Sequence, residues 1–216
     1  MIRTPGLALA ALLAAALPGC APAGPSPSAI TAPVEVRAEA RPDIVAELNA
    51  ARTDPAAYAR KARALRALYR GDRIERPGEV AEVTREGMAA VDEAIAFLER
   101  QPPLPPLRDS PLLARAAADH AGEQAATGEV AHDGADGSSP ADRMRRYGRW
   151  SATGEAIAYG RDRAGDVILQ LIIDDGVPDR GHRRILFNPA YSLVGAACAA
   201  HPVWRRACVL DFARAG

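Results

Sequence analysis

The chain has 216 residues, with 27 Lys or Arg and 27 Asp or Glu, so its formal net charge is zero. Because the charges balance and no block of five or more basic residues occurs, nucleic acid is not an expected partner. Residues 41–216 are long enough for one domain with one hydrophobic core.

Residues 1–19 have the pattern of a signal peptide. Arg3 supplies a positive charge, and the apolar segment "GLALAALLAAALPG" after it is too short to span a bilayer. The sequence "LPGC", which ends at Cys20, resembles the bacterial lipoprotein box, in which the cysteine carries a lipid. Residues 20–40 would then be a lipidated cysteine followed by a Pro/Ala/Ser-rich tether.

We therefore expect export to the bacterial cell envelope and attachment to a membrane through a lipid on Cys20. Cleavage by an ordinary signal peptidase near "APA" is the alternative, and it would give a secreted soluble protein.

Helical patterns dominate the first part of the domain. The segment "DIVAELNAART" has apolar side chains at helical spacing, and Asp43 is its expected N-cap. Asp54-Pro55 interrupts this pattern, so a second helix should begin near Pro55. A third amphipathic helix is expected over residues 87–101, followed by "PPLPPL" as an extended connector.

Further helices and then strands are expected toward the C-terminus. Ser110 and Pro111 should begin a long helix that Gly128 ends. We expect shorter helices over 140–148 and 163–174, and strands around Ile157 and over 194–197 and 209–212. Helices first and a hairpin last predict an α+β fold, with helices packed against a small, largely antiparallel sheet.

Cys198 and Cys208 are expected to form a disulfide. They flank the nine residues "AAHPVWRRA", and an antiparallel hairpin centred on Val203 would place them directly opposite each other. Closing this loop would stabilise the fold by about 2–3 kcal/mol. Two unpaired buried thiols are the alternative, which is less expected in an exported chain.

Four polar positions beside glycine are candidates for a functional site. They are His132 in "EVAHDGADGSSP", Glu155 in "TGEAIA", the pair Asp174–Asp175, and His182 in "RGHRRILFNP". Two histidines and two carboxylates are a common ligand set for a divalent transition metal, or the parts of a general acid/base pair. The short motifs HExxH, CxxC and GxSxG are absent from the sequence.

Each histidine also has a simpler interpretation. His182 could cap the helix that is expected to start at Arg183, and His132 could be a loop residue. His120 is expected to be a packed helix residue, and His201 a solvated residue at the hairpin tip. No serine lies in a motif that activates its hydroxyl.

Six segments occur in an order that resembles the CAP superfamily. They are "LNAARTDPAAYA", "LLARAAADHA", "HDGADGSSPADRM", "GEAIA", "GHRRILFNPAYSLVGAA" and "CVLDFA". This superfamily, also called SCP-like, includes cysteine-rich secretory proteins, venom allergens and plant pathogenesis-related proteins, and the chain resembles its bacterial members over residues 43–213. The resemblance implies an α-β-α sandwich with a central groove lined by two histidines and two acidic residues.

The resemblance also implies which residues line this groove. His132 and His182 match the two histidines, and Glu155 matches the glutamate of the "GEN" motif, whose asparagine is alanine here. The second acidic position falls on Asp174 or Asp175, with Asp175 slightly favoured. The segment "DDGVPDR" is longer than the usual "NSPGHR" turn, so both residues stay candidates.

Three functions follow as hypotheses. In the favoured one, His132 and His182 hold a divalent ion such as Zn²⁺, and the groove binds an unknown small-molecule, peptide or protein ligand of the envelope. The alternative is a hydrolase of envelope peptide or lipid that uses metal-activated water or a Glu155/His182 acid–base pair. In the third, the polar cluster only stiffens the groove.

Overall fold

The computed structural model describes residues 38–216, so the predicted signal peptide, Cys20 and most of the tether lie outside the described residues. The described residues belong to one compact unit. Its centre is a five-stranded sheet with the strand order β1-β7-β8-β6, in which β5 also pairs with β7. All pairs are antiparallel except β5–β7. The strands are β1 (Glu39–Ala40), β5 (Arg108–Asp109), β6 (Trp150–Tyr159), β7 (Leu193–His201) and β8 (Arg205–Ala215).

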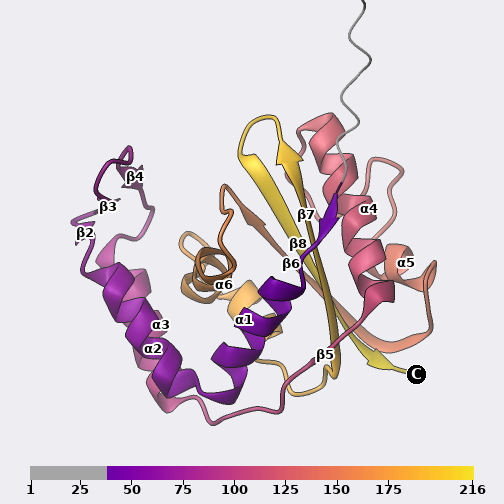
Figure 1. The fold of residues 1–216 in the computed structure, drawn as a ribbon, viewed down its shortest axis with the longest axis horizontal. Helices are drawn as coiled ribbons and strands as arrows, with labels where there is room; N and C mark the ends of the chain where they lie inside the picture. The colour runs from indigo at the N-terminus through magenta and orange to yellow at the C-terminus, as the bar shows by residue number, and fades with distance from the viewer. Residues whose placement is uncertain (1–37) are drawn as a thin grey trace, which may run out of the picture. The chain divides into compact units, whose positions relative to one another are not determined.

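Helices cover both faces of this sheet. Helix α4 (Pro111–Thr127) lies on one face, while α1 (Pro42–Thr53) and α6 (Ala164–Ile173) lie on the other, as Figure 1 shows. Strand alternation produces the two faces, since Ala156 packs into the core under α6 and Ile157 packs against the alanines of α4. The α+β fold and its α-β-α sandwich are therefore confirmed.

Helix α4 approaches the sheet closely at Gly195 of β7. A Cβ atom at this position would lie 2.1 Å from the backbone nitrogen of Ala114, which is far inside van der Waals contact. Only glycine therefore allows this spacing between helix and strand. The close packing fixes the position of α4. The loop that carries His132 starts at the C-terminal end of this helix.

An outer group of elements lies beyond α6. It consists of α2 (Pro55–Arg66), α3 (Met88–Arg100) and a small three-stranded antiparallel sheet between them. The sequence patterns did not predict this sheet. Its strands have two residues each, so they are too short to show alternation. They are β2 (Tyr69–Arg70), β3 (Arg73–Ile74) and β4 (Glu82–Val83).

Most of the predicted helix ends are confirmed. The Ser110 side chain accepts a hydrogen bond from the Leu113 amide, and Gly128 ends α4 with a left-handed φ of 76°. The prediction for Asp43 is wrong. Helix α1 begins one residue earlier, at Pro42, and the Asp43 carboxylate accepts hydrogen bonds from Arg41 instead of capping the helix.

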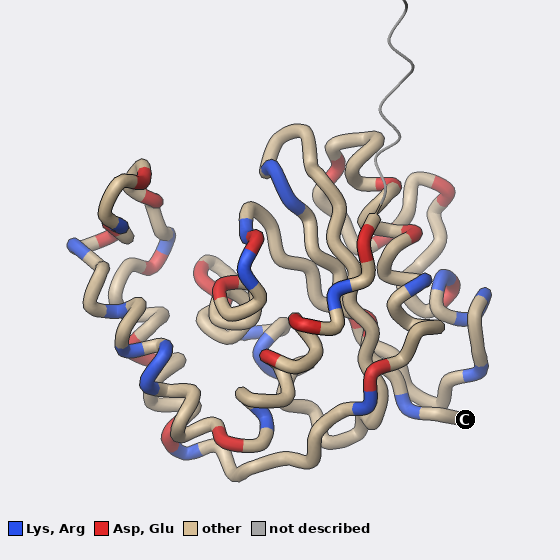
Figure 2. Tube along the Cα trace, viewed as in Figure 1, with Lys and Arg blue, Asp and Glu red and all other residues tan. Residues whose placement is uncertain are grey.

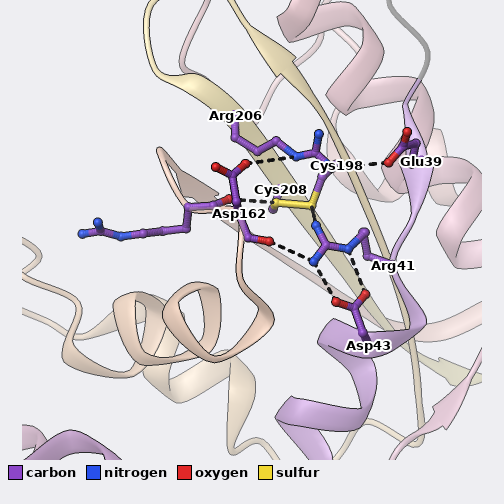
Figure 3. The surroundings of a disulfide bond; sticks show 8 residues. Glu39, Arg41, Asp43, Asp162, Cys198, Arg206 and Cys208 are labelled. Atoms are coloured by element: carbon purple, nitrogen blue, oxygen red, sulfur yellow. Dashed lines mark hydrogen bonds and ion pairs between the residues drawn. A yellow bond between two sulfur atoms is a disulfide. The ribbon is translucent and has the colours of Figure 1, made fainter. Parts of the chain in front are cut away.

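The disulfide between Cys198 and Cys208 is confirmed. The two residues are opposite each other on β7 and β8, with a Cα–Cα distance of 4.1 Å. Figure 3 shows that the Arg41 side chain lies beside this bond, with Nη1 3.6 Å from the Cys198 sulfur and Nη2 3.0 Å from the Asp162 carbonyl oxygen. Arg41 therefore joins the start of α1 to the hairpin.

The prediction that His201 is solvated is wrong, because its side chain is buried. Its Nδ1 accepts hydrogen bonds from the Val203 and Trp204 amides at 3.2 and 3.1 Å, and its Nε2 lies 3.2 Å from the Glu129 carbonyl oxygen. His201 thus shapes the turn from within. The sequence contained a usable signal, because His201 directly precedes a turn that contains a proline. A polar side chain at such a position can accept hydrogen bonds from the backbone amides of the turn.

Acidic and basic residues are interspersed along the described chain, including along α2 and α3 (Figure 2). The exclusion of nucleic acid stays a prediction. Within residues 38–216, no helix combines the length and the hydropathy that a membrane span requires.

Candidate functional site

The first half of the site is built around Glu155. Its carboxylate is buried on β6, with Oε1 2.8 Å from His132 Nδ1 and Oε2 2.7 Å from Arg143 Nη2. Arg143 belongs to the short helix α5 (Pro140–Arg145) and is itself buried. A buried guanidinium with a charged hydrogen bond fixes the carboxylate in place, and the carboxylate fixes the imidazole.

The loop that carries His132 is held from both ends. Arg143 donates hydrogen bonds to the His132 carbonyl oxygen at 2.7 Å and to the Ser138 carbonyl oxygen at 2.9 Å. In α4, His120 Nε2 lies 2.8 Å from the Ala131 carbonyl oxygen, and the Gln124 amide donates to the same oxygen at 2.7 Å. His120 is buried in its helix, so that prediction is confirmed, and it also fixes the backbone beside His132.

The second half of the site is formed by Asp174 and His182. Asp174 ends α6 in the left-handed conformation, with φ of 56°, and His182 is the second residue of α7 (Gly181–Leu186). Asp174 Oδ1 lies 2.6 Å from His182 Nδ1, while Oδ2 accepts the His182 backbone N–H at 2.9 Å. The cap of α7 is therefore the Asp174 carboxylate, and the His182 ring is not used as a cap.

Asp174, and not the slightly favoured Asp175, is the acid that pairs with His182. The Asp175 carboxylate accepts hydrogen bonds from the Arg85 and Glu86 amides at 2.7 and 2.8 Å. It also lines the cleft described below, but it bonds to the loop before α3 and not to a histidine. The left-handed turn at Asp174 directs the two neighbouring side chains to different partners, which spacing along the sequence could not show.

The two imidazoles meet beside β6. Their ring centroids are 6.1 Å apart and their planes are inclined by 38°. His132 comes from the loop after α4, on one face of the sheet, and His182 comes from α7, which follows α6 on the other face. Each Nδ1 is bound to a carboxylate, so each ring has its Nε2 left for another partner.

The sequence model of the Cysteine-rich secretory protein family, CAP, matches residues 45–212. The chain belongs to this family.

Solved structures that are similar to this CAP domain include the following three proteins. An outer surface protein from Borrelia burgdorferi is 19% identical, with a TM-score of 0.45 and a match over 52% of this chain and 80% of that one. An extracellular protein containing a SCP domain from Bacillus anthracis is 19% identical, with a TM-score of 0.42 over 59% and 38% of the two chains.

A cysteine-rich secretory protein from Staphylococcus aureus is 20% identical, with a TM-score of 0.37 over 58% and 37% of the two chains. The match therefore spans little more than a third of the Bacillus and Staphylococcus chains. A search of the curated proteins finds no significant match.

The two Nε2 atoms are the donors that this CAP domain offers to a metal. Two histidines that share a tetrahedral zinc ion with Zn–N distances of about 2.0–2.1 Å have ring centroids about 5 Å apart. The observed distance is 6.1 Å, so the two rings would have to move closer together to share such an ion. Within residues 38–216 there is no cluster of three or more His, Cys, Asp or Glu side chains suited to one ion. Glu155 and Asp174 are used to orient the rings, so the other ligands of such an ion would be water or a bound molecule.

A second buried acid, Asp211, lies behind Glu155. It faces Glu155 across the β6–β8 pair, it is fully buried, and neither of its carboxyl oxygens has a hydrogen-bond partner among the described residues. Burial and the neighbouring Glu155 carboxylate raise the pKa of Asp211 well above its usual range. The sequence motifs singled out neither Asp211 nor Arg143, although an aspartate within the apolar strand "CVLDFA" was a usable signal.

A cleft of about 190 Å³ opens beside His182. Its walls come from β6, α6 and the small sheet. The lining is mixed. Its aliphatic residues include Leu65, Ile74, Leu171, Ile173 and Val177, and its charged residues are Arg76, Glu82, Arg161, Asp166, Asp174 and Asp175. On the small-sheet side, the Glu82 carboxylate accepts hydrogen bonds from both Arg76 and Arg161, which lowers the Glu82 pKa against the effect of its burial.

Proposed function

We propose that this protein is an exported, lipid-anchored CAP-domain protein of the bacterial envelope. In this proposal His132 and His182 hold a divalent metal, Zn²⁺, and the adjoining cleft takes up an envelope or extracellular ligand. The observation that carries it is the pairing of each Nδ1 with a buried carboxylate, which leaves both Nε2 atoms as ligands. Export is supported by the N-terminal sequence pattern and by the Cys198–Cys208 disulfide.

The protein's own groups have separate tasks in this proposal. Arg143 fixes Glu155, and Glu155 and Asp174 hold the rings in the tautomer whose Nε2 lone pair is free. Bound zinc would supply a Lewis acid that polarises a carbonyl group or water. The half-exposed His132 ring leaves the site open to solvent and therefore to a ligand.

Zinc titration by calorimetry tests the metal site. The unmodified protein should bind about one zinc ion, and a variant with both His132→Ala and His182→Ala should show no binding at this site. His201→Gln is the matched control, because it removes an imidazole that shapes the hairpin turn. Unchanged zinc binding in the double variant would exclude the metal proposal.

A hydrolase is the second candidate function. It is favoured by the two imidazole–carboxylate pairs, since an imidazole backed by a carboxylate is a common general base. Among the described residues, neither ring bonds to a Ser, Thr or Cys side chain, so the attacking group would be water. Peptidoglycan fragments, peptides and ester lipids are the substrates to screen. A turnover lost in Glu155→Gln, with unchanged thermal unfolding, supports this function, and no turnover of any of the three classes contradicts it.

A further inference from the structure

Strand β6 is an edge strand, and the orientation of its backbone groups follows from the disulfide. Cys198 and Cys208 form a pair with Cα atoms 4.1 Å apart, the spacing of antiparallel residues that do not exchange hydrogen bonds with each other. The backbone groups of Cys208 therefore point the other way, toward Ala158 of β6. Since orientation alternates along a strand, Glu155, Ile157 and Tyr159 direct their amide and carbonyl groups away from β8.

Two side-chain hydrogen bonds agree with this orientation. Gln170 Nε2 donates to the Tyr159 carbonyl oxygen at 3.1 Å, and the Tyr191 hydroxyl donates to the Thr153 carbonyl oxygen at 3.0 Å. Both acceptors are thus on the outer edge of β6. Between them, the backbone groups of Glu155 and Ile157 on this edge have no partner among the described residues.

These groups lie at the functional site. His132 and His182 approach the edge of β6 from opposite faces of the sheet, and Ile157 and Tyr159 line the cleft beside His182. Both Glu155 and Ile157 are buried residues. Backbone donors and acceptors in such a position require a partner, either water or a ligand that supplies both kinds of group.

The cleft indicates the size of that ligand. An aliphatic cavity of about 150 Å³ accepts benzene. The volume of about 190 Å³ beside His182 is therefore sufficient for a branched aliphatic or aromatic side chain, and Leu65, Ile74, Leu171 and Ile173 offer it apolar contacts within a lining that also contains charged residues. An acyl chain would fill such a space but would leave the N–H and C=O groups of β6 without partners.

We propose that the ligand is an extended peptide that adds to the outer edge of β6 at Glu155–Ile157. Its backbone pairs with these two residues in the manner of an added strand, and one apolar side chain of leucine or phenylalanine size enters the cleft. The peptide then runs along the edge of β6 beside His132 and His182, and not between the two rings, whose centroids are 6.1 Å apart. This inference names the ligand class of the groove in the proposed function, and it does not require the metal.

The test uses acetyl-Ala-Ala-Leu-Ala-Ala-amide as the probe, with binding and amide hydrogen exchange followed by NMR. We expect slower exchange of the Glu155 and Ile157 amides when the peptide is bound, and loss of binding when its leucine is replaced by aspartate. Two further probes are N-methylated, one at the leucine and one at the next alanine. Because alternate amides of a strand face its neighbour, one of them should bind about fivefold or more weakly and the other should retain its affinity.

A variant pair tests the cleft. Val177→Trp fills it from a half-buried wall position and should weaken binding, whereas Val83→Trp, on the same side of the molecule but outside the cleft lining, should not. Absence of binding to the unmodified protein, equal effects of the two N-methyl groups, or unchanged exchange at Glu155 and Ile157 would each overturn the proposal.

Titrations of the unmodified protein with zinc alone and with the peptide alone separate the two proposals. Peptide binding without zinc binding in the unmodified protein removes the metal and keeps the peptide. Zinc binding without peptide binding does the reverse.

Discussion

The Asp174 carboxylate has two roles, since one oxygen caps α7 and the other orients the His182 ring. Asp174→Asn keeps an acceptor for the backbone amide but removes the charge behind the imidazole. We expect its zinc affinity to fall by about 10–100-fold, the usual cost of losing a carboxylate behind a ligand. Asp175→Asn is the control and should leave zinc affinity unchanged, because Asp175 bonds to Arg85 and Glu86. Equal effects of the two substitutions in calorimetry would show that Asp174 does not support a metal ligand.

Asp211 predicts an unusual pH dependence of stability. Its folded-state pKa is raised by burial and by Glu155, with Asp119 acting in the same direction and Arg143 opposing them. The protonated form therefore favours folding below the unfolded-state pKa of about 3.9, and this contribution is lost as the pH rises toward the folded-state pKa. Asp211→Asn has no ionisable carboxyl group at this position, so the variant should not show this loss of stability as the pH rises. Urea unfolding from pH 4 to pH 8 should show a stability difference that shifts in favour of the variant as the pH rises, and a difference independent of pH would contradict this.

Individual residues also show where sequence patterns are insufficient. Ser110 and Gly128 were predictable because their roles are local, within one turn of a helix. The roles of Asp174, Asp211 and Arg143 are set by contacts between segments distant in sequence. The motifs gave His132, Glu155 and His182 as candidates, but only the fold shows that they lie together and that Asp174, not Asp175, accompanies His182.

At the scale of the elements, the contact between α4 and β7 is the most sensitive to substitution. Gly195→Ala would force a methyl group against the backbone of Leu113 and Ala114, and backbone atoms cannot move aside as a side chain can. We expect a loss of about 3 kcal/mol or more in the free energy of unfolding, at the upper end of overpacking effects.

Gly122→Ala in the same helix is the matched control. No atom outside its own helix lies within 4 Å of the added carbon, so the better helix propensity of alanine should raise stability by up to about 1 kcal/mol. Urea unfolding measures both values. Similar losses for the two variants would mean that the helix–strand spacing is not set by Gly195.

The elements themselves were largely predictable. Long periodic helices and the hairpin strands contain enough residues for a pattern to repeat, and prolines and capping residues mark several of their ends. The small sheet β2–β4 was missed, yet it forms one wall of the cleft. Two-residue strands carry no periodicity, so their pairing depends on the turns between them and on the packing of α2 and α3.

At the scale of the whole molecule, the proposed membrane attachment rests on Cys20, outside the described residues. Cys20→Ala should move the protein from the membrane fraction to the soluble fraction of a bacterial expression host, because several acyl chains are removed. Mass spectrometry of the mature N-terminus gives the independent measurement. A mature chain that begins at an unmodified residue after Cys20 would exclude the anchor and favour the secreted form.

The position of strand β1 next to the disulfide affects how the domain would respond to a pulling force. Glu39 and Ala40 pair with Cys198 and Ala197, so tension applied through the chain ahead of residue 38 enters the sheet beside the covalent link to Cys208. The hairpin cannot be unzipped at that position while the link is intact, and Arg41 clamps the entering chain to it. A protein pulled from this end would therefore lose its two-residue β1 pairing before its central strands separate. The pairing of β1 with β7 would break first, and the groove with the two histidines would keep its structure.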